Sequence, residues 1–174
     1  MIPGQGYTWA VIVVVMGVAG VGKTTVGRLL AEGEGWPFFD ADDFHSPASK
    51  DKMRQGLGLT DAEREPWLNA LRAKIDELRA TGRSGVFACS ALKDAYRQHL
   101  QAGPDVRFVY LKGSFELVRA RLETRAGHYA GASLLRSQFD ALEEPQGVPA
   151  IDAALAPEEM LRATRRALAL EAQT

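Results

Sequence analysis

The residues with the clearest chemical meaning lie near the amino terminus, where eight consecutive positions follow the pattern G-x-x-x-x-G-K-[ST]. These positions are Gly17, Val18, Ala19, Gly20, Val21, Gly22, Lys23 and Thr24. In such a loop the glycines let the backbone wrap a phosphate, and the backbone amides donate to it. Lys23 would reach the β and γ phosphates, and Thr24 would offer its hydroxyl to Mg²⁺. The pattern predicts a nucleoside triphosphate site; the alternative is a glycine-rich turn with an accidental lysine.

The segments on either side of this loop favour the first interpretation. Residues 11–15 are a β-branched block without polar alternation, which is typical of a strand buried on both faces of a parallel sheet. Residues 24–32 predict a helix that Gly33 and Gly35 would end. A strand before the loop and a helix after it are the context that the motif requires.

Strands and helices are expected to alternate through the rest of the chain. Further strands are predicted at residues 37–40, 86–89, 106–111 and 148–151. Helices are predicted after a Thr60–Glu63 capping-box pattern, with a helical stretch opening at Pro66, then around 92–100, 115–125 and 134–142, and from Pro157 onward. We therefore expect a three-layer α/β P-loop fold, with a five-stranded parallel sheet covered by helices on both faces. Ligands should bind at the carboxyl ends of the strands.

We expect a single domain over residues 1–174, with a lead at 1–8 and a short glycine-containing lid near 125–133. Its 46% of apolar residues suit one core. The 21 basic and 22 acidic residues give a net charge of −1, so no overall basic field would attract nucleic acid or a membrane. Cys89 is the single cysteine, which excludes an intramolecular disulfide and favours a cytoplasmic location. The apolar run at 9–22 is too short and too broken by glycine to span a bilayer.

Several separated motifs resemble the gluconate kinases of the shikimate-kinase-like group. They are MGVAGVGKTT at 16–25, DADDFH at 40–45, KM at 52–53, LTDAEREPWL at 59–68, CSALKDAYR at 89–97, VYLKG at 109–113, RLETRAGHY at 121–129 and QFDALEEP at 138–145. The motifs follow one another across nearly the whole chain. The resemblance implies transfer of the γ-phosphoryl group of ATP to D-gluconate, giving 6-phospho-D-gluconate, with Mg²⁺ as cofactor. The chain departs from the family pattern in its lead, its short lid and the abbreviated segment near Val148.

Two carboxylates receive roles from this resemblance. Asp40 would help to hold the magnesium shell together with Thr24, and Asp42 would receive the proton of the attacking hydroxyl. Both residues end an expected strand, and we expect their side chains to point to opposite sides of the extended chain and to serve different tasks. The alternative is that they are helix caps or solvated turn residues.

The loop motif and a basic segment around the expected lid indicate the nucleotide contacts. Residues 119–136 contain four arginines and one acid around the expected lid, a charge that suits phosphates. Arg125 would stabilise the transferred phosphoryl group from the lid, with Lys23, and Arg121 would pack near the adenine. The remaining nucleotide contacts would come from the loop itself, Gly17, Val18, Ala19, Gly20, Val21, Gly22, Lys23, Thr24 and Thr25. The alternative for the arginines is an ordinary basic helix face.

Substrate contacts are predicted at polar and positively charged residues inside the matched motifs. They are Asp42, His45, Lys52, Arg64, Ser90, Lys93 and Arg97. Any of the four cations could bind the carboxylate of a sugar acid, arginine by a bidentate fork, and each could equally belong to a solvated face. Two other functions stay open: a kinase of another hydroxy acid such as shikimate, and a nucleotide-binding regulatory module without an acceptor. A homodimer is left open as well.

Overall fold

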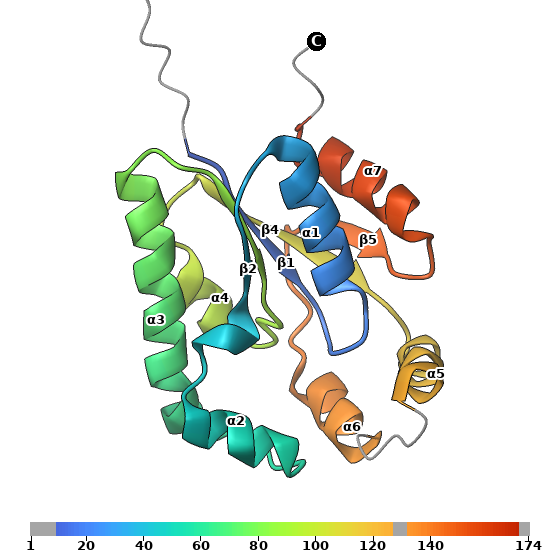
Figure 1. Cartoon of the computed structure of the whole chain (residues 1–174). Helices are drawn as coiled ribbons and strands as arrows, with labels where there is room; N and C mark the ends of the chain where they lie inside the picture. Colours follow the sequence, from blue (N-terminus) through green and yellow to red (C-terminus); the bar gives the residue numbers. More distant parts are fainter. Residues whose placement is uncertain (1–9, 127–131, 171–174) are drawn as a thin grey trace, which may run out of the picture.

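The computed structural model describes residues 10–126 and 132–170 of the chain. Within them five strands form one parallel sheet in the order β2-β3-β1-β4-β5 (Figure 1). Their bounds are Ile12–Met16 for β1, Phe38–Asp40 for β2, Gly85–Ala88 for β3, Val106–Lys112 for β4 and Ala150–Asp152 for β5. The predicted fold class, with its five parallel strands, is confirmed.

Helices cover both faces of the sheet, as expected. Their bounds are Lys23–Glu34 for α1, Pro47–Arg54 for α2, Asp61–Ala80 for α3, Asp94–Leu100 for α4, Phe115–Ala126 for α5, Ala132–Ala141 for α6 and Pro157–Ala167 for α7. A short 3₁₀ turn, η1, spans Ala41–Phe44. Helices α3 and α4 pack on one face, and α1 and α7 on the other, while α2 and α6 lie near the carboxyl ends of the strands (Figure 1).

The central strand β1 explains why the sheet has a core on each side. All five of its residues are buried, and it pairs with β3 on one edge and β4 on the other. Val14 faces a core with Leu71 and Ile75 of α3, whereas Val13 faces a core with Leu30 of α1. A strand that is apolar at every position therefore serves both helical layers.

Two details of the helices differ from the sequence prediction. Helix α2 was not predicted, because none of its eight residues is buried and no apolar period marks it. Helix α3 begins at Asp61, immediately after a capping box between Thr60 and Glu63, so Pro66 lies inside the helix. Residues 127–131 of the expected lid lie outside the described residues. Nowhere in the described ranges is a helix both long and apolar enough to cross a membrane.

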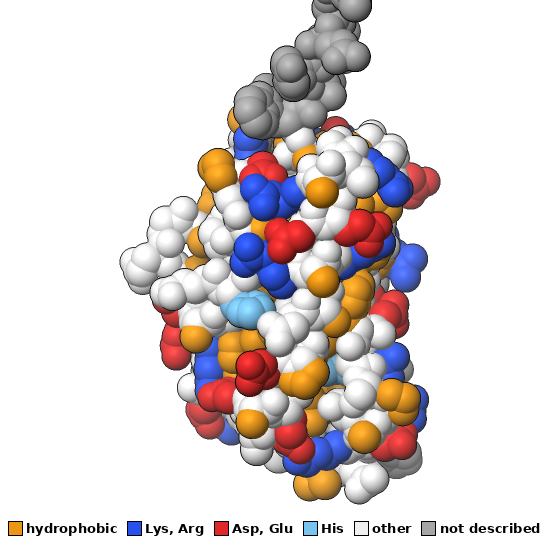
Figure 2. Space-filling model, turned by 90° about the vertical axis from the view of Figure 1, so that its left-hand side faces the viewer, with side chains coloured by type: hydrophobic (Ala, Val, Ile, Leu, Met, Phe, Trp, Pro, Cys, Tyr) orange, Lys and Arg blue, Asp and Glu red, His pale blue; other side chains and the backbone are white. Residues whose placement is uncertain are grey.

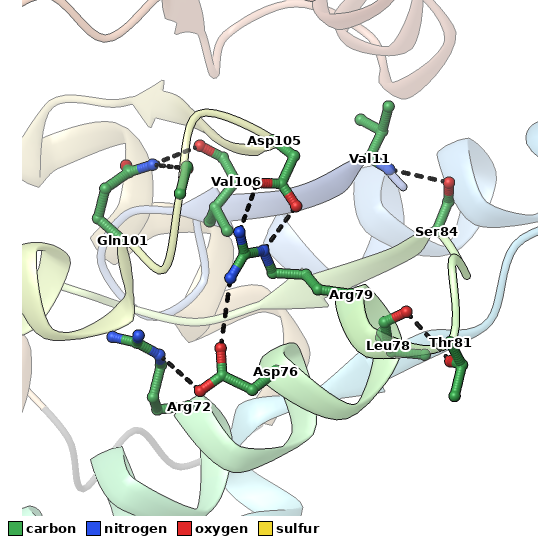
Figure 3. Close-up of polar contacts among 11 residues, drawn as sticks. Val11, Arg72, Asp76, Leu78, Arg79, Thr81, Ser84, Gln101, Asp105 and Val106 are labelled. Carbon is green, nitrogen blue, oxygen red and sulfur yellow. Dashed lines mark hydrogen bonds and ion pairs between the residues drawn. The ribbon is translucent and has the colours of Figure 1, made fainter. Parts of the chain in front are cut away.

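The amino-terminal edge of the sheet is fastened to α3 by a charged fork. Arg79 donates from Nε to Asp105 Oδ2 at 2.6 Å and from Nη2 to Oδ1 at 3.0 Å (Figure 3). Both side chains are half-buried, and Asp76 also contacts the guanidinium of Arg79. The fork connects the end of α3 with the residue that precedes β4. Such a bidentate contact is stronger than an exposed ion pair.

Acidic and basic side chains alternate on the outer face of α3. The pairs Arg72–Asp76 and Lys74–Glu77 lie on this helix. Figure 2 shows this side of the molecule, where red and blue side chains lie beside one another with apolar side chains between them. Positive and negative side chains therefore balance one another on this face, as they do over the whole chain.

We expect Asp105→Asn to lower the free energy of unfolding by about 1 kcal/mol at neutral pH. The Arg79 guanidinium lowers the pKa of the Asp105 carboxyl below its usual value. This stabilisation is therefore present above the pKa of the unfolded chain and is lost as pH falls through the lowered pKa. Urea unfolding of both proteins from pH 7 to pH 2 measures it. The pair Lys74–Glu77 provides the control, and Glu77→Gln should change the free energy of unfolding little at any pH. Equal losses of stability in Asp105→Asn and Glu77→Gln would contradict a special role of the Arg79–Asp105 contact.

Candidate functional site

The phosphate loop connects β1 with α1 and depends on glycine at defined positions. Gly17, Gly20 and Gly22 have φ angles of +145°, +76° and +110°, which side-chain-bearing residues rarely adopt. A Cβ on Gly17 would lie 2.7 Å from the carbonyl oxygen of Leu111 in β4, which is too close. Gly22 is the N-cap of α1 and has no side chain to bond the first amides of that helix. Those amides are thus available to an anion.

Lys23, the first residue of α1, holds the loop from inside. Its Nζ donates to the carbonyl oxygen of Val18 at 2.8 Å. Burial lowers the pKa of Lys23, whereas the charge of Asp42 and that of Asp40 oppose this shift. The ammonium group is therefore desolvated and lies in the field of both carboxylates.

Asp40 and Asp42 are arranged differently from the extended chain that the sequence suggested. Asp40 ends β2 and caps the 3₁₀ turn, with its Oδ1 accepting from the backbone N–H of Asp42 at 3.0 Å. The expectation of two side chains on opposite sides of a continuing strand is wrong, because residues two apart on a strand share a face and because the chain turns at Ala41. Desolvation and the charge of Asp40 raise the pKa of Asp42, against the opposing effect of Lys23. A raised pKa is suited to a group that accepts a proton.

A cavity of about 490 Å³ opens beside the phosphate loop, between α5 and the start of α7. Arg121 and Arg125 of α5 line it together with Gly20, Gly22 and Thr25 of the loop region. Its other walls are mainly apolar, formed by Leu117, Ala120, Leu155, Pro157 and Met160. Both arginines that the sequence singled out therefore lie beside the loop, next to a surface that suits a flat apolar ring.

A second cavity, of about 150 Å³, adjoins the carboxyl ends of β2 and β3. It brings together residues from separate motifs that were predicted to contact the substrate, namely Asp42, His45, Arg64, Ser90 and Lys93. Helix α6 forms another wall with Leu134, Ser137, Gln138 and Ala141. We refer to this space as the acceptor cavity.

Asp61, the first residue of α3, organises the cations of the acceptor cavity. Its Oδ1 lies 3.0 Å from Lys93 Nζ and 3.8 Å from Arg64 Nη1, and it also accepts from the hydroxyl of Tyr96. These hydrogen bonds lower the pKa of Asp61 and raise that of Lys93. Asp61 and Tyr96 were not among the predicted site residues, although they lie inside the motifs at 59–68 and 89–97.

The other two predicted cations, Lys52 and Arg97, do not line the acceptor cavity. Lys52 Nζ pairs with Glu63 at 2.8 Å and so joins α2 to the capping box of α3. Arg97 is buried and donates to the carbonyl oxygens of Ala91, Leu92 and Glu143. Both side chains hold backbone segments together, and we leave them out of the candidate site.

His45 packs against the side of the acceptor cavity. Its ring stacks on that of Trp67, with centroids 4.6 Å apart, and the residue is 8% exposed. Burial and the nearby charges of Arg64 and Lys50 lower the pKa of His45 to about 4. The ring is therefore neutral near pH 7, and its buried Nδ1 has no hydrogen-bond partner among the described residues. A polar ligand in the cavity could supply that partner.

Cys89 follows β3 and is buried. Desolvation raises the pKa of its thiol to about 12. The thiolate form that a nucleophile requires is therefore strongly disfavoured. This agrees with the interpretation of Cys89 as a packed strand residue.

We expect His45→Phe to reduce the acid sensitivity of the fold. The unfolded histidine binds a proton near pH 6.5 and the folded one near pH 4. Acidification between these values thus destabilises the wild-type protein, by up to about 3 kcal/mol from this group. Phenylalanine keeps a ring on Trp67 and removes the titration. Urea midpoints at pH 7 and pH 4.5 test this, and an equal loss in both proteins would rule it out.

The comparisons with known proteins agree with this arrangement. Residues 19–144 match the family model for shikimate kinase. The chain is 45% identical over 150 residues to a probable gluconokinase of Xenopus tropicalis, covering 77% of this chain and 79% of that protein. It is 39% identical over 163 residues to a gluconokinase of Arabidopsis thaliana, covering 84% and 86%. A crystal structure of a gluconokinase from Sinorhizobium meliloti 1021 superposes with a TM-score of 0.83 at 40% identity, covering 93% of both chains. With its phosphate loop and acceptor cavity, the chain belongs to the gluconokinase family within the shikimate-kinase-like P-loop kinases.

Proposed function

We propose that this protein transfers the γ-phosphoryl group of ATP to D-gluconate, giving 6-phospho-D-gluconate and ADP. The observation that carries the proposal is that the phosphate loop borders a large, mainly apolar cavity, while a smaller cavity is lined by Asp42 together with other charged and polar side chains. Two such cavities suit a nucleotide on one side and a small hydroxylated acceptor on the other. The gluconokinase relatives support the identity of this acceptor.

The nucleotide would occupy the larger cavity, with its phosphates in the loop. The amides at the start of α1 would donate to the phosphate oxygens, because Gly22 leaves them without a side-chain cap. Lys23 would exchange its hydrogen bond with Val18 for one with a phosphate oxygen. Arg121 would lie along the apolar wall with the adenine, and Arg125 would neutralise charge on the transferred group.

Thr24 and Asp40 would hold the magnesium ion. Their hydroxyl and carboxylate oxygens are the hard donors that Mg²⁺ prefers. Among the described residues no group of three or more acidic, histidine or cysteine side chains could hold a metal. The phosphates of the nucleotide would supply further oxygen ligands. When bound, the ion would offset negative charge on the phosphates.

Asp42 would orient the attacking hydroxyl and take its proton. Its raised pKa increases its ability to accept a proton, and it lies at the wall of the acceptor cavity. The hydroxyl oxygen would form the new bond to the γ phosphorus as the bond between that phosphorus and the β–γ bridging oxygen breaks. The proton goes to the Asp42 carboxylate. Most of the catalytic effect would come from positioning and charge neutralisation.

Arg64 is our choice for binding the carboxylate of the acceptor. Lys93 is already paired with Asp61 at 3.0 Å, whereas Arg64 lies 3.8 Å from that carboxylate. One Arg64 N–H group donates to the Tyr96 hydroxyl at 3.2 Å, and a guanidinium has five donors in total. Arg64 therefore keeps donors for a bidentate contact. Ser90 and the neutral ring of His45 would bind hydroxyl groups. A cytoplasmic location and the choice between monomer and homodimer stay predictions.

A coupled assay of ADP formation tests this function. We expect ATP turnover to rise strongly when D-gluconate is added, with little response to shikimate. Stimulation by shikimate but not by D-gluconate would identify shikimate as the acceptor. No stimulation by either compound would favour a regulatory nucleotide-binding module.

Asp42→Asn should lower gluconate-dependent turnover by roughly 100-fold or more, since a positioned base contributes about that much, while ATP binding is retained. Wild-type kcat/KM should fall as pH drops through the raised pKa of Asp42.

We expect Arg64→Met to raise the KM for gluconate by at least about tenfold, the equivalent of one strong charged hydrogen bond. The KM for ATP should change little, because Arg64 does not line the larger cavity. Steady-state kinetics with each substrate varied in turn measures both values. Arg72→Met, in the same helix and outside both cavities, is the matched control. An unchanged KM for gluconate would mean that another residue binds the carboxylate of the acceptor, and Lys93 would be the next candidate.

A further inference from the structure

Gln138 of α6 forms a direct hydrogen bond to the phosphate loop. The backbone N–H of Ala19, the third residue of the loop motif, donates to Gln138 Oε1 at 2.7 Å. The two residues are 119 positions apart in the sequence. Gln138 is half-buried and is also one of the residues that line the acceptor cavity. It therefore touches both halves of the proposed active site.

This bond fixes the orientation of the Gln138 carboxamide. A backbone N–H can only donate, so the oxygen of the carboxamide must face Ala19. The Nε2 group, with two N–H donors, then faces away from the loop. It makes no hydrogen bond to the residues that the structure describes, although the cavity beside it contains Asp42 and Ser90. The donors of Gln138 are thus available to a ligand in that cavity.

Other backbone bonds hold the same wall in place. The N–H of Glu143, just after α6, donates to the carbonyl oxygen of Leu92 at 2.9 Å. The carbonyl oxygen of Ser90 accepts from the N–H of Gly17, the first residue of the loop, at 3.3 Å. The loop, the segment after β3 and α6 are therefore connected, and Gln138 supplies the side-chain connection.

We propose that Gln138 is a positioning residue that couples nucleotide binding to acceptor binding in the proposed gluconate kinase reaction. Phosphates in the loop would order the amide of Ala19 and thereby the carboxamide of Gln138. The ordered Nε2 would then donate to an oxygen of the acceptor. By linkage, the acceptor must strengthen nucleotide binding by the same factor. This inference deepens the proposed function and rests on it.

Calorimetric titration of the full chain with D-gluconate tests the coupling, once with and once without a saturating non-hydrolysable ATP analogue. We expect the analogue to tighten gluconate binding in the wild type by at least about fivefold, the lower end of usual coupling factors. In Gln138→Met, which keeps the side-chain volume and removes both polar groups, this ratio should fall to about one. An unchanged ratio in this variant would overturn the proposal.

Two further variants separate coupling from a merely structural bond. Ser137→Ala is the matched control, because this neighbour lines the same cavity but donates its hydroxyl to Leu134 of its own helix. It should keep the wild-type ratio and melting temperature. Gln138→Glu keeps an oxygen for the Ala19 amide and loses the two donors, so coupling predicts a ratio near one. A wild-type ratio in Gln138→Glu would mean that only the bond to the loop matters, and would also overturn the proposal.

The outcome for the wild type distinguishes this inference from the function on which it rests. A wild type that phosphorylates gluconate but binds it equally well with and without the analogue refutes the coupling alone. A wild type that does not phosphorylate gluconate refutes the proposed function and the coupling together. In the expected case, Gln138→Met also lowers kcat for gluconate by about tenfold, with an unchanged melting temperature.

Discussion

The close approach of two backbone segments beneath the phosphate loop is the constraint on which the rest of the structure depends. The residue that follows β1, Gly17, has to be a glycine, because the carbonyl oxygen of Leu111 occupies the space that a Cβ would need. The loop therefore lies directly on β4, and the central position of β1 makes this contact possible. From there the chain can turn its amides inward at the start of α1. The larger cavity is lined by this turn, and Gln138 connects the turn to the wall of the acceptor cavity.

Burial also shifts the pKa values of the charged groups beside the phosphate loop. Desolvation lowers the pKa of Lys23 and raises that of Asp42, yet each lies in the opposing field of the other. Farther out, Asp61 takes up Lys93 and leaves Arg64 less strongly paired. A chain with almost no net charge can thus still bind anions, because some of its positive groups lie beside the loop and in one wall of the acceptor cavity.

Helix α6 gives the site its connection between the two ligands. Its inner surface closes the acceptor cavity, and Gln138 extends from it to the loop. The segment that follows α6 is fixed by Arg97, whose buried guanidinium bonds three backbone carbonyl groups. Arg97, a cation inside a family motif, therefore holds backbone segments in place. The uncharged side chain of Gln138 is the one that contacts the loop. Hydrogen bonds therefore connect the wall of the acceptor cavity with the phosphate loop.

The sequence by itself determined the phosphate loop, the apolar central strand, the order of the strands and of every described helix except α2, and the motifs that carry the family likeness. These are local signals, because glycine at defined spacing and runs of β-branched residues act through neighbouring positions. Only the tertiary structure decided that Asp42 turns away from β2, that Lys52 and Arg97 are committed elsewhere and that Gln138 contacts Ala19. Each of these depends on a partner from another element, and no local pattern specifies which partner a polar side chain meets.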